Sequence, residues 1–173
     1  QAGGAGFLLA LPARLAAAHA AAYYSGGPEG AGKGMARVRV TRRLHFCAAH
    51  RLGRDDWSRE QNERVFGLCS NANWHGHNYE LYVTVKGEIN SQTGYIANLK
   101  TISEVIKSEV IEKLDHKNLN VDVGFMNGVL SSSENLAVAI WKELEGPISK
   151  LGVSLYKVKI QETENNFAEY LGE

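Results

Sequence analysis

The fold is decided by two stretches in which apolar and polar residues alternate, RVRVTRRLHFCAAH at 37–50 and HNYELYVTVK at 77–86. Successive side chains of a strand point to opposite faces, so one parity is buried and the other is exposed. Both stretches are therefore predicted to be half-buried strands. The apolar parities contain Val38, Val40, Leu44, Phe46 and Ala48 in the first stretch, and Tyr79, Leu81, Val83 and Val85 in the second.

Two amphipathic helices and two further strands are predicted after this pair. Residues 99–114 and 132–145 carry apolar side chains three and four positions apart, which is typical of helices that pack on a core. Residues 153–162 alternate again, and residues 166–171 form a short last strand. The order β-β-α-α-β-β predicts an α+β fold, with a four-stranded antiparallel sheet and both helices on one face.

Local signals refine this outline. The polar residues 51–74 predict a long loop with a short helix near Ser58–Val65. Two pairs have the spacing of a capping box at the start of a helix, Thr101 with Glu104 and Ser131 with Glu134.

Composition excludes several classes of protein. The 173 residues include 19 Lys+Arg and 19 Asp+Glu, and a net charge of zero argues against binding nucleic acid by bulk charge. No apolar run approaches the roughly 18–20 residues of a transmembrane helix, so no membrane partner is expected. Two cysteines, Cys47 and Cys69, are too few for a disulfide framework, which favours a reducing, cytoplasmic location.

The chain divides by composition near Met35. Residues 1–34 contain 11 Ala and 8 Gly, and we expect them to be an Ala/Gly-rich extension, either disordered or a leader, with a targeting role as a weaker alternative. Residues 35–173 are expected to be the functional domain. A domain of this size buries enough surface to fold without a metal or a disulfide, so any metal that it holds would serve chemistry.

Each apolar strand face ends in a titratable residue. The first strand ends at His50, the second begins with His75 and His77, and Glu162 ends the third at the same parity. In a meander, the end of the first strand lies beside the start of the second, so the three histidines are predicted to converge. A third strand that runs in the same direction as the first would bring Glu162 to the same end of the sheet.

The three histidines form a candidate metal site. Residues i and i+2 of a strand point to one side, so His75 and His77 can reach one ion, and His50 supplies a third nitrogen. Zinc with three protein ligands and an open fourth position is the catalytic arrangement. The alternative is that these are surface histidines or core histidines with satisfied hydrogen bonds.

Three other positions are chemically suggestive but ambiguous from the residues alone. Cys69 is read as a fourth ligand, a base, or a small buried residue. Asp115 and His116 follow the first helix and are read either as a carboxylate–imidazole relay or as a histidine that compensates the helix dipole. Glu162 is read as a receptor for a cationic or N–H-rich ligand, or as an exposed strand end. Cys47 has the opposite parity to His50 and receives no functional role.

Over residues 37–173 the sequence resembles the 6-pyruvoyl-tetrahydropterin synthase family. The segments that carry the resemblance occur in the family's order: AHRL at 49–52, FGLCSNANWHGHNY at 66–79, LDHKNL at 114–119, SEN at 133–135 and YKVKIQETENN at 156–166. This resemblance implies the tunnelling fold, in which sheets of several subunits join into a barrel. It also implies a homohexamer, built as a dimer of trimers, with active sites between subunits.

The resemblance assigns a role to each candidate. It implies one Zn²⁺ per subunit on His50, His75 and His77, and a proton-handling triad of Cys69, Asp115 and His116. It implies that Glu162 anchors the pterin and that Ser132, Ser133 and Glu134 contribute to substrate binding. The implied activity is a lyase reaction of tetrahydrobiopterin biosynthesis, in which 7,8-dihydroneopterin triphosphate loses triphosphate and becomes 6-pyruvoyl-tetrahydropterin.

Two departures and two alternatives accompany the resemblance. Trp74 stands where the family has Gly before the first histidine of the pair, and Ser132-Ser133 stands where it often has Thr-Thr. The related 6-carboxy-tetrahydropterin synthases place three residues between the cysteine and the histidine pair, whereas five intervene here, Ser70 to Trp74. That activity and a non-catalytic pterin-binding homologue are the alternative functions.

Overall fold

The sheet is organised around one long antiparallel strand pair. The computed structural model describes residues 35–173, so the expectation for residues 1–34 lies outside the described residues. Strands β1 (Arg37–His50) and β2 (His75–Glu88) pair along their whole length, from Arg37 opposite Glu88 to His50 opposite His75. Their apolar parities share one face, where the rings of Phe46 and Tyr79 stack with centroids 5.0 Å apart.

The complete sheet has five strands in the order β3-β1-β2-β4-β5. Strands β4 (Ser154–Gln161) and β5 (Phe167–Tyr170) extend it antiparallel on the β2 side, as predicted. The prediction of four antiparallel strands is wrong in one respect, because β3 (Lys117–Asn118) adds a fifth strand that runs parallel to β1. A strand of two residues is too short to show periodicity, so no pattern in the sequence indicates it.

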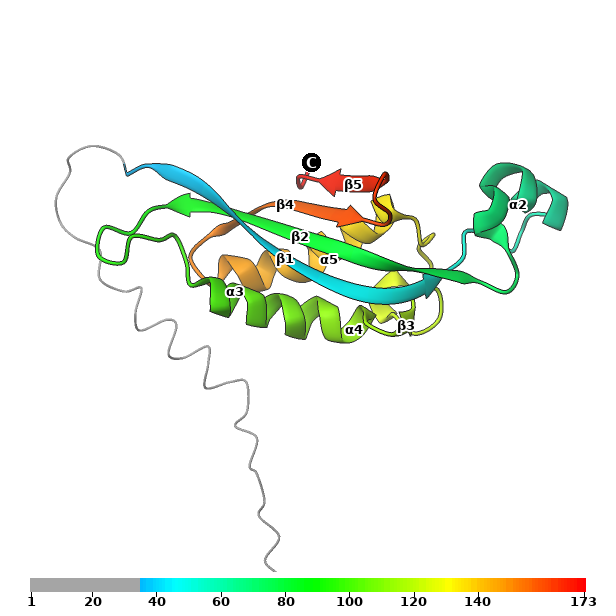
Figure 1. The fold of residues 1–173 in the computed structure, drawn as a ribbon, viewed down its shortest axis with the longest axis horizontal. Coiled ribbons are helices and arrows are strands. Elements are labelled where there is room, and N and C mark those ends of the chain that lie inside the picture. Colours follow the sequence, from blue (N-terminus) through cyan, green and yellow to red (C-terminus); the bar gives the residue numbers. More distant parts are fainter. Residues whose placement is uncertain (1–34) are drawn as a thin grey trace, which may run out of the picture. The chain divides into compact units, whose positions relative to one another are not determined.

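Both long helices cover one face of the sheet (Figure 1). Helix α3 (Leu99–Ile106) continues through a π-helical turn η2 (Lys107–Ile111) into α4 (Glu112–Leu114), and α5 is Ser133–Ser149. Helix α5 continues past the predicted end at residue 145, although Pro147 lies inside it. Ile148 in that last turn is fully buried, and its burial offsets the hydrogen bond that the proline cannot donate.

Both predicted capping boxes are wrong by a few residues. Asn98 is the N-cap of α3, where its side chain accepts a hydrogen bond from the backbone N–H of Lys100. Ser132 is the N-cap of α5 and accepts from the N–H of Asn135. The observed caps lie three residues before Thr101 and one residue after Ser131, and because Asn and Ser both cap helices well, spacing alone did not identify them.

The loop between β1 and β2 contains the predicted short helix. Helix α2 (Arg59–Phe66) begins at the N-cap Ser58 and is followed by a 3₁₀ turn η1 (Gly67–Ser70), which contains Cys69. A second 3₁₀ turn, η3 (Gly124–Met126), precedes α5.

Among residues 35–173, no helix combines the length and apolar composition that crossing a membrane requires.

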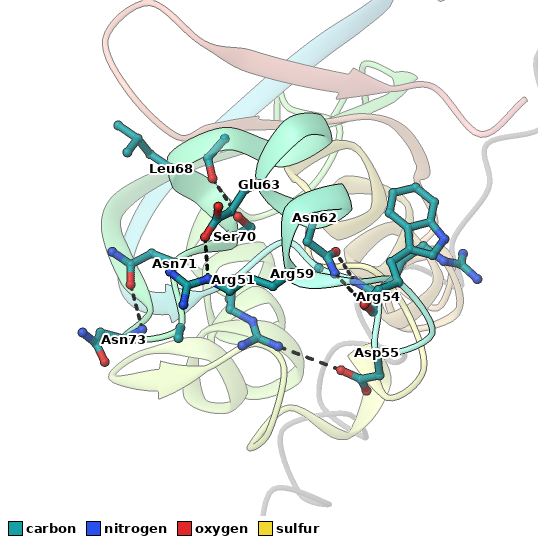
Figure 2. Close-up of a pocket in the computed structure, with 14 residues that line it drawn as sticks. Arg51, Arg54, Asp55, Arg59, Asn62, Glu63, Leu68, Ser70, Asn71 and Asn73 are labelled. Carbon is teal, nitrogen blue, oxygen red and sulfur yellow. Dashed lines mark hydrogen bonds and ion pairs between the residues drawn. The ribbon is translucent and has the colours of Figure 1, made fainter.

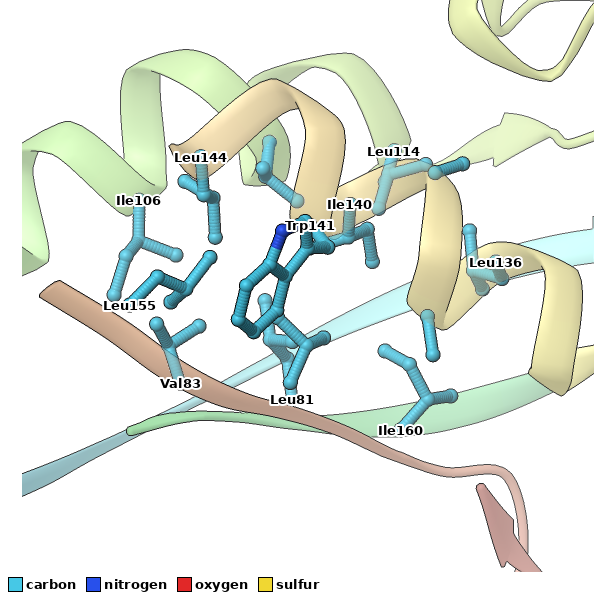
Figure 3. Packing of buried hydrophobic residues seen from close by; sticks show 14 of the residues in the cluster. Leu81, Val83, Ile106, Leu114, Leu136, Ile140, Trp141, Leu144, Leu155 and Ile160 are labelled. Carbon is cyan, nitrogen blue, oxygen red and sulfur yellow. The ribbon is translucent and has the colours of Figure 1, made fainter. Parts of the chain in front are cut away.

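The core lies between the helices and the sheet. Figure 3 shows Leu81 and Val83 of β2 and Ile160 of β4 facing Ile140, Trp141 and Leu144 of α5. Each fully buried aliphatic side chain stabilises the fold by about 1.5–3 kcal/mol relative to exposure. This core lies along the middle of the strands, and the polar residues at the ends of the same faces lie beyond it.

Candidate metal centre and active site

The three histidines converge at the end of the helix-covered face, as the strand parity predicts. His50 is the last residue of β1 and lies opposite His75, the first residue of β2, while His77 follows two residues later on the same side. The ring centroid of His50 lies 4.4 Å from that of His75 and 5.2 Å from that of His77. The ring centroids of His75 and His77 lie 5.1 Å apart. One nitrogen from each ring lies within 4.8 Å of the others, so the group can hold a metal ion.

The hydrogen bonds of the rings leave nitrogens for a metal. Nδ1 of His50 lies 2.8 Å from the carbonyl oxygen of Ser131. A carbonyl only accepts, so Nδ1 carries the proton and donates, which leaves the lone pair on Nε2. Within residues 35–173, Nε2 of His50 and Nδ1 of His75 are buried without a hydrogen-bond partner. Such orphaned nitrogens are costly unless a ligand fills them, and an all-nitrogen set suits zinc.

Burial keeps the three rings neutral near pH 7. Desolvation lowers the pKa of His50, and the hydrogen bond to Ser131 and the charge of Glu162 oppose this only in part. Desolvation is also the largest cause that lowers the pKa of His75 and of His77. Only unprotonated imidazole binds a metal, so all three histidines are in the form that can bind a metal ion at neutral pH.

The metal-free protein is expected to lose stability as the pH falls below about 6.5. The folded state keeps the pKa of these histidines below their ordinary value, whereas the unfolded chain restores it, so the unfolded state binds more protons in acid. Each unit of lowering is worth about 1.4 kcal/mol, present above pH 6.5 and lost as the pH falls through the lowered values. Urea unfolding at pH 7.5 and 5.0 would measure the loss.

A matched control separates this effect from other titrations. The His75→Ala/His77→Ala protein, also free of metal, should show a much flatter dependence between the same two pH values. An equal loss in both proteins would contradict the assignment to the histidines.

Glu162 joins the histidines from the third long strand. It follows β4, which runs in the same direction as β1 because both pair antiparallel with β2. Its Oε1 lies 3.5 Å from Nε2 of His50 and 3.8 Å from Nε2 of His77, so the predicted convergence is confirmed. The carboxylate is four-fifths buried and therefore available to a ligand that enters beside the histidines.

Tyr79 is a polar member of the site that sequence reasoning placed in the core alone. Burial, the charge of Glu162 and a hydrogen bond to Glu162 all raise the pKa of the Tyr79 phenol. Its ring lies 5.5 Å from that of His77. The signal was present in the sequence, because Tyr79 continues the parity of His75 and His77.

Cys69 lies outside the group of metal ligands. Its backbone carbonyl accepts a hydrogen bond from the N–H of Leu52 at 2.8 Å, which ties the η1 turn to the end of β1. The thiol is partly buried and unbonded to Cys47.

Asp115 and His116 form the ion pair of the predicted carboxylate–imidazole relay, beside the β1 backbone at Cys47. Oδ2 of Asp115 lies 3.0 Å from Nδ1 of His116, and Oδ1 accepts the backbone N–H of Cys47 at 2.8 Å. That backbone hydrogen bond is the main cause that lowers the pKa of Asp115. The side chain of His116 is 80% exposed and its φ is +59°, an uncommon conformation for a residue other than glycine. Among residues 35–173, no hydrogen bond or ion pair joins this relay to Cys69 or Glu162.

The start of α5 adjoins the metal site through its backbone. Ser132 caps the helix, and Oγ of Ser133 is buried without a hydrogen-bond partner within residues 35–173. Glu134 is exposed in the first turn. The residue that touches the candidate metal centre is Ser131, whose carbonyl orients His50.

Asn120 is a supporting residue that carried no sequence signal. Its Oδ1 accepts from the backbone N–H of Arg51 at 3.0 Å, and its Nδ2 donates to the Arg51 carbonyl at 2.9 Å. Oγ of Ser131 donates to Oδ1 of Asn120 at 2.9 Å. One loop asparagine thus fixes the backbone directly after His50 and the serine that holds the His50 ring.

The glycine between the two paired histidines is required by a close approach of strands. A Cβ at Gly76 would lie 2.9 Å from the carbonyl oxygen of Ala48 on β1, closer than real Cβ contacts. Any side chain there would push the two strands apart, and His50 would move away from His75 and His77.

Comparison with known proteins defines the class. The family model described as 6-pyruvoyl tetrahydropterin synthase matches residues 39–173. The chain is 45% identical over 145 residues to the 6-pyruvoyl tetrahydrobiopterin synthase of Homo sapiens, covering 84% of this chain and 98% of that protein. It is 44% identical to the Dictyostelium discoideum protein of the same name, covering 79% and 97%.

A solved structure agrees with these relatives. The Caenorhabditis elegans 6-pyruvoyl tetrahydropterin synthase superposes with a TM-score of 0.75 at 37% identity, over 80% of this chain and 98% of that one. The chain therefore belongs to the 6-pyruvoyl tetrahydropterin synthase family, and the expectation of an enzyme of this family is confirmed.

Proposed function

We propose that the chain converts 7,8-dihydroneopterin triphosphate into 6-pyruvoyl-tetrahydropterin, with elimination of triphosphate, in the cytoplasm. The observation that carries this proposal is the meeting of Glu162 with His50, His75 and His77 at one end of the sheet. The histidines offer a site for one zinc ion per chain. Glu162 offers a carboxylate that accepts the amino and ring N–H groups of a pterin in a bidentate way.

The residues divide the chemistry between them. A zinc ion on the three histidines would supply Lewis acidity at the hydroxylated side chain of the substrate. The Cys69 thiolate takes the proton from the carbon whose acidity is raised in this way. Asp115 holds the His116 imidazole in one orientation, and His116 returns a proton to the substrate. Ser132, Ser133 and Glu134 at the start of α5 contribute to substrate binding.

Within residues 35–173 the Asp115–His116 pair makes no hydrogen bond or ion pair with Cys69, which supports an assembly in which neighbouring copies complete each site. Strand β3 pairs only with Ala48 and Ala49, so most of the outer edge of β1 is free within residues 35–173, and β5 forms the other edge of the sheet. Free edges are ready to pair with another copy. We therefore propose that sheets join edge to edge in trimers, that two trimers form a hexamer, and that Asp115 and His116 act on the substrate of a neighbouring copy.

Incubation of the zinc-loaded protein with 7,8-dihydroneopterin triphosphate tests the proposed reaction. The product mass and the release of triphosphate should rise together, one for one. A product whose side chain is shortened to a carboxyl group would indicate the 6-carboxy type of activity, and tight pterin binding without turnover would indicate a non-catalytic homologue.

A Glu162→Ala variant is expected to keep its metal and to bind the pterin poorly. A hydrogen bond to a charged group contributes about 1.5–3 kcal/mol, so the loss of a bidentate carboxylate should raise KM by about 10- to 100-fold or more. Steady-state kinetics and metal analysis of the same preparation would measure both. Glu164→Ala, an exposed carboxylate two residues away, is the matched control and should behave as wild type. Loss of zinc from Glu162→Ala would contradict the role as a pterin anchor.

A further inference from the structure

A polar cavity lies beside the candidate metal centre and is not used by the chemistry above. It has a volume of about 830 Å³ and is enclosed by the end of β1, helix α2 and the η1 turn (Figure 2). Its lining includes the carboxylates of Asp55 and Glu63 together with three arginines and three asparagines: Arg51, Arg54, Arg59, Asn62, Asn71 and Asn73. Leu68 and Ser70, the two neighbours of Cys69 in the chain, also line it.

The cavity begins where the β1–β2 ladder ends. His50 and His75 form the last facing pair of the ladder, and Arg51 and Trp74 are the next residue on each strand. Consecutive Cα atoms are about 3.8 Å apart, so these two residues stand directly beyond the metal ligands. An extended substrate whose reacting carbons lie at the histidines would leave the sheet at the end where Arg51 and Trp74 follow the candidate ligands in the chain.

Arg51 is the cation of this cavity that lacks a close counter-ion among residues 35–173. Its guanidinium lies 3.9 Å from Oδ1 of the fully exposed Asp55, too far for a hydrogen bond. In contrast, Arg54 donates to both carboxylate oxygens of Asp56 at 2.9 Å. Arg59 donates to Glu63 at 2.7 Å. The Arg51 fork is therefore the one whose charge is available for an anion.

The position of Arg51 is fixed in advance from two sides. Asn120 pairs with both the N–H and the carbonyl of its backbone, and Ser131 donates to the same carbonyl at 3.2 Å. The guanidinium carbon lies 5.3 Å from the centre of the Trp74 ring, within the range of a cation–π contact. A binding group held in this way loses little freedom when a ligand arrives.

Trp74 keeps this contact in spite of an unfavourable backbone. Its φ is +65°, a left-handed conformation that glycine adopts without cost and a bulky residue does not. Strain of this kind persists where the surrounding structure holds it, and it is concentrated at functional sites. The partner that the Trp74 ring contacts is Arg51.

We infer that the Arg51 guanidinium, supported by the Trp74 ring, binds the polyphosphate tail of the substrate. The inference rests on the proposed function for the identity of that substrate. Two parallel N–H groups of a guanidinium match two oxygens of a phosphate, and phosphate is more than a single negative charge at neutral pH. The asparagines and Ser70 around the cavity offer neutral donors to the remaining oxygens.

Inorganic tripolyphosphate is the probe that tests the site without the pterin. Calorimetric titration into the zinc-loaded wild type should show binding, and Arg51→Gln should weaken the Kd by about 10- to 100-fold. Arg54→Gln removes an arginine of the same cavity that is already paired, and should change the Kd by less than about threefold. Equal effects of the two substitutions, or no binding to the wild type, would overturn the inference. Zinc content and thermal unfolding would verify that each variant is folded.

Kinetics with the pterin substrate form the second arm. Arg51→Gln should raise KM by the same factor and leave kcat within about threefold, and Arg51→Lys should recover part of the loss because it keeps the charge without the fork. An unchanged KM would overturn the inference even if tripolyphosphate binding were lost. If the wild type bound tripolyphosphate through Arg51 but never turned over the pterin, the proposed function would fail and the anion site would stand.

A third variant examines the supporting ring. Trp74→Gly suits the left-handed backbone and should fold at least as well as the wild type, yet it should bind tripolyphosphate several-fold more weakly. Unweakened binding by Trp74→Gly would remove Trp74 from the site.

Discussion

A Cys69→Ala variant is expected to retain its zinc and its affinity for the pterin while losing turnover. The thiol lies outside the group of three histidines that can hold the metal, so its removal leaves that group complete. A general base contributes about 10²- to 10⁴-fold to a rate, and we expect a loss of at least this size in kcat. Metal analysis, pterin binding and single-turnover kinetics would measure the three properties separately.

Two outcomes would contradict the role of Cys69. Loss of zinc would make the cysteine a ligand, and near-normal turnover would exclude it as the base. Cys69→Ser should be nearly as slow as Cys69→Ala, because a hydroxyl does not ionise near neutral pH. Cys47→Ala is the matched control. The substitution removes a thiol that donates to the side chain of Asn78, and it keeps the backbone N–H that donates to Asp115.

The His75→Ala/His77→Ala protein is expected to lose both its metal and its activity while remaining folded. It keeps one of the three candidate ligands, His50, and one imidazole does not hold zinc tightly. The hydrophobic core lies along the middle of the strands, so cooperative unfolding should persist. Metal content after reconstitution and turnover of 7,8-dihydroneopterin triphosphate are the measurements. Zinc retained at one equivalent per chain would contradict the histidine site.

The sequence predicted the metal end of the sheet because its strands are long and alternate cleanly. The parity of β1 and β2 places His50, His75 and His77 on one side of the sheet, and the direction of β4 brings Glu162 to the same end. Side chains alternate between the two faces of a strand, so the face of one residue gives the face of every other residue on it. The candidate metal ligands lie on such strands.

The parts that the sequence did not predict depend on irregular backbone. The two-residue strand β3 is defined by contacts with β1 and has no period of its own. Asn120 and Ser131 act through hydrogen bonds to Arg51 across about 70 to 80 residues of chain, and no local pattern announces such partners. Asp115 and His116 make no hydrogen bond or ion pair with Cys69 within residues 35–173, and the spacing of these residues in the sequence does not reveal this.

Gly76 changes what a sequence motif means in this protein. The two histidines beside it belong to the group that could hold a metal ion, whereas the glycine is required by the carbonyl of Ala48 on the adjacent strand. In a saturation screen, position 76 should therefore score as intolerant as the ligands themselves, although its side chain would touch neither metal nor substrate. The sequence His-Gly-His therefore reflects two separate constraints, one from the candidate metal ion and one from the neighbouring backbone. A design that introduces this sequence into another protein must satisfy both.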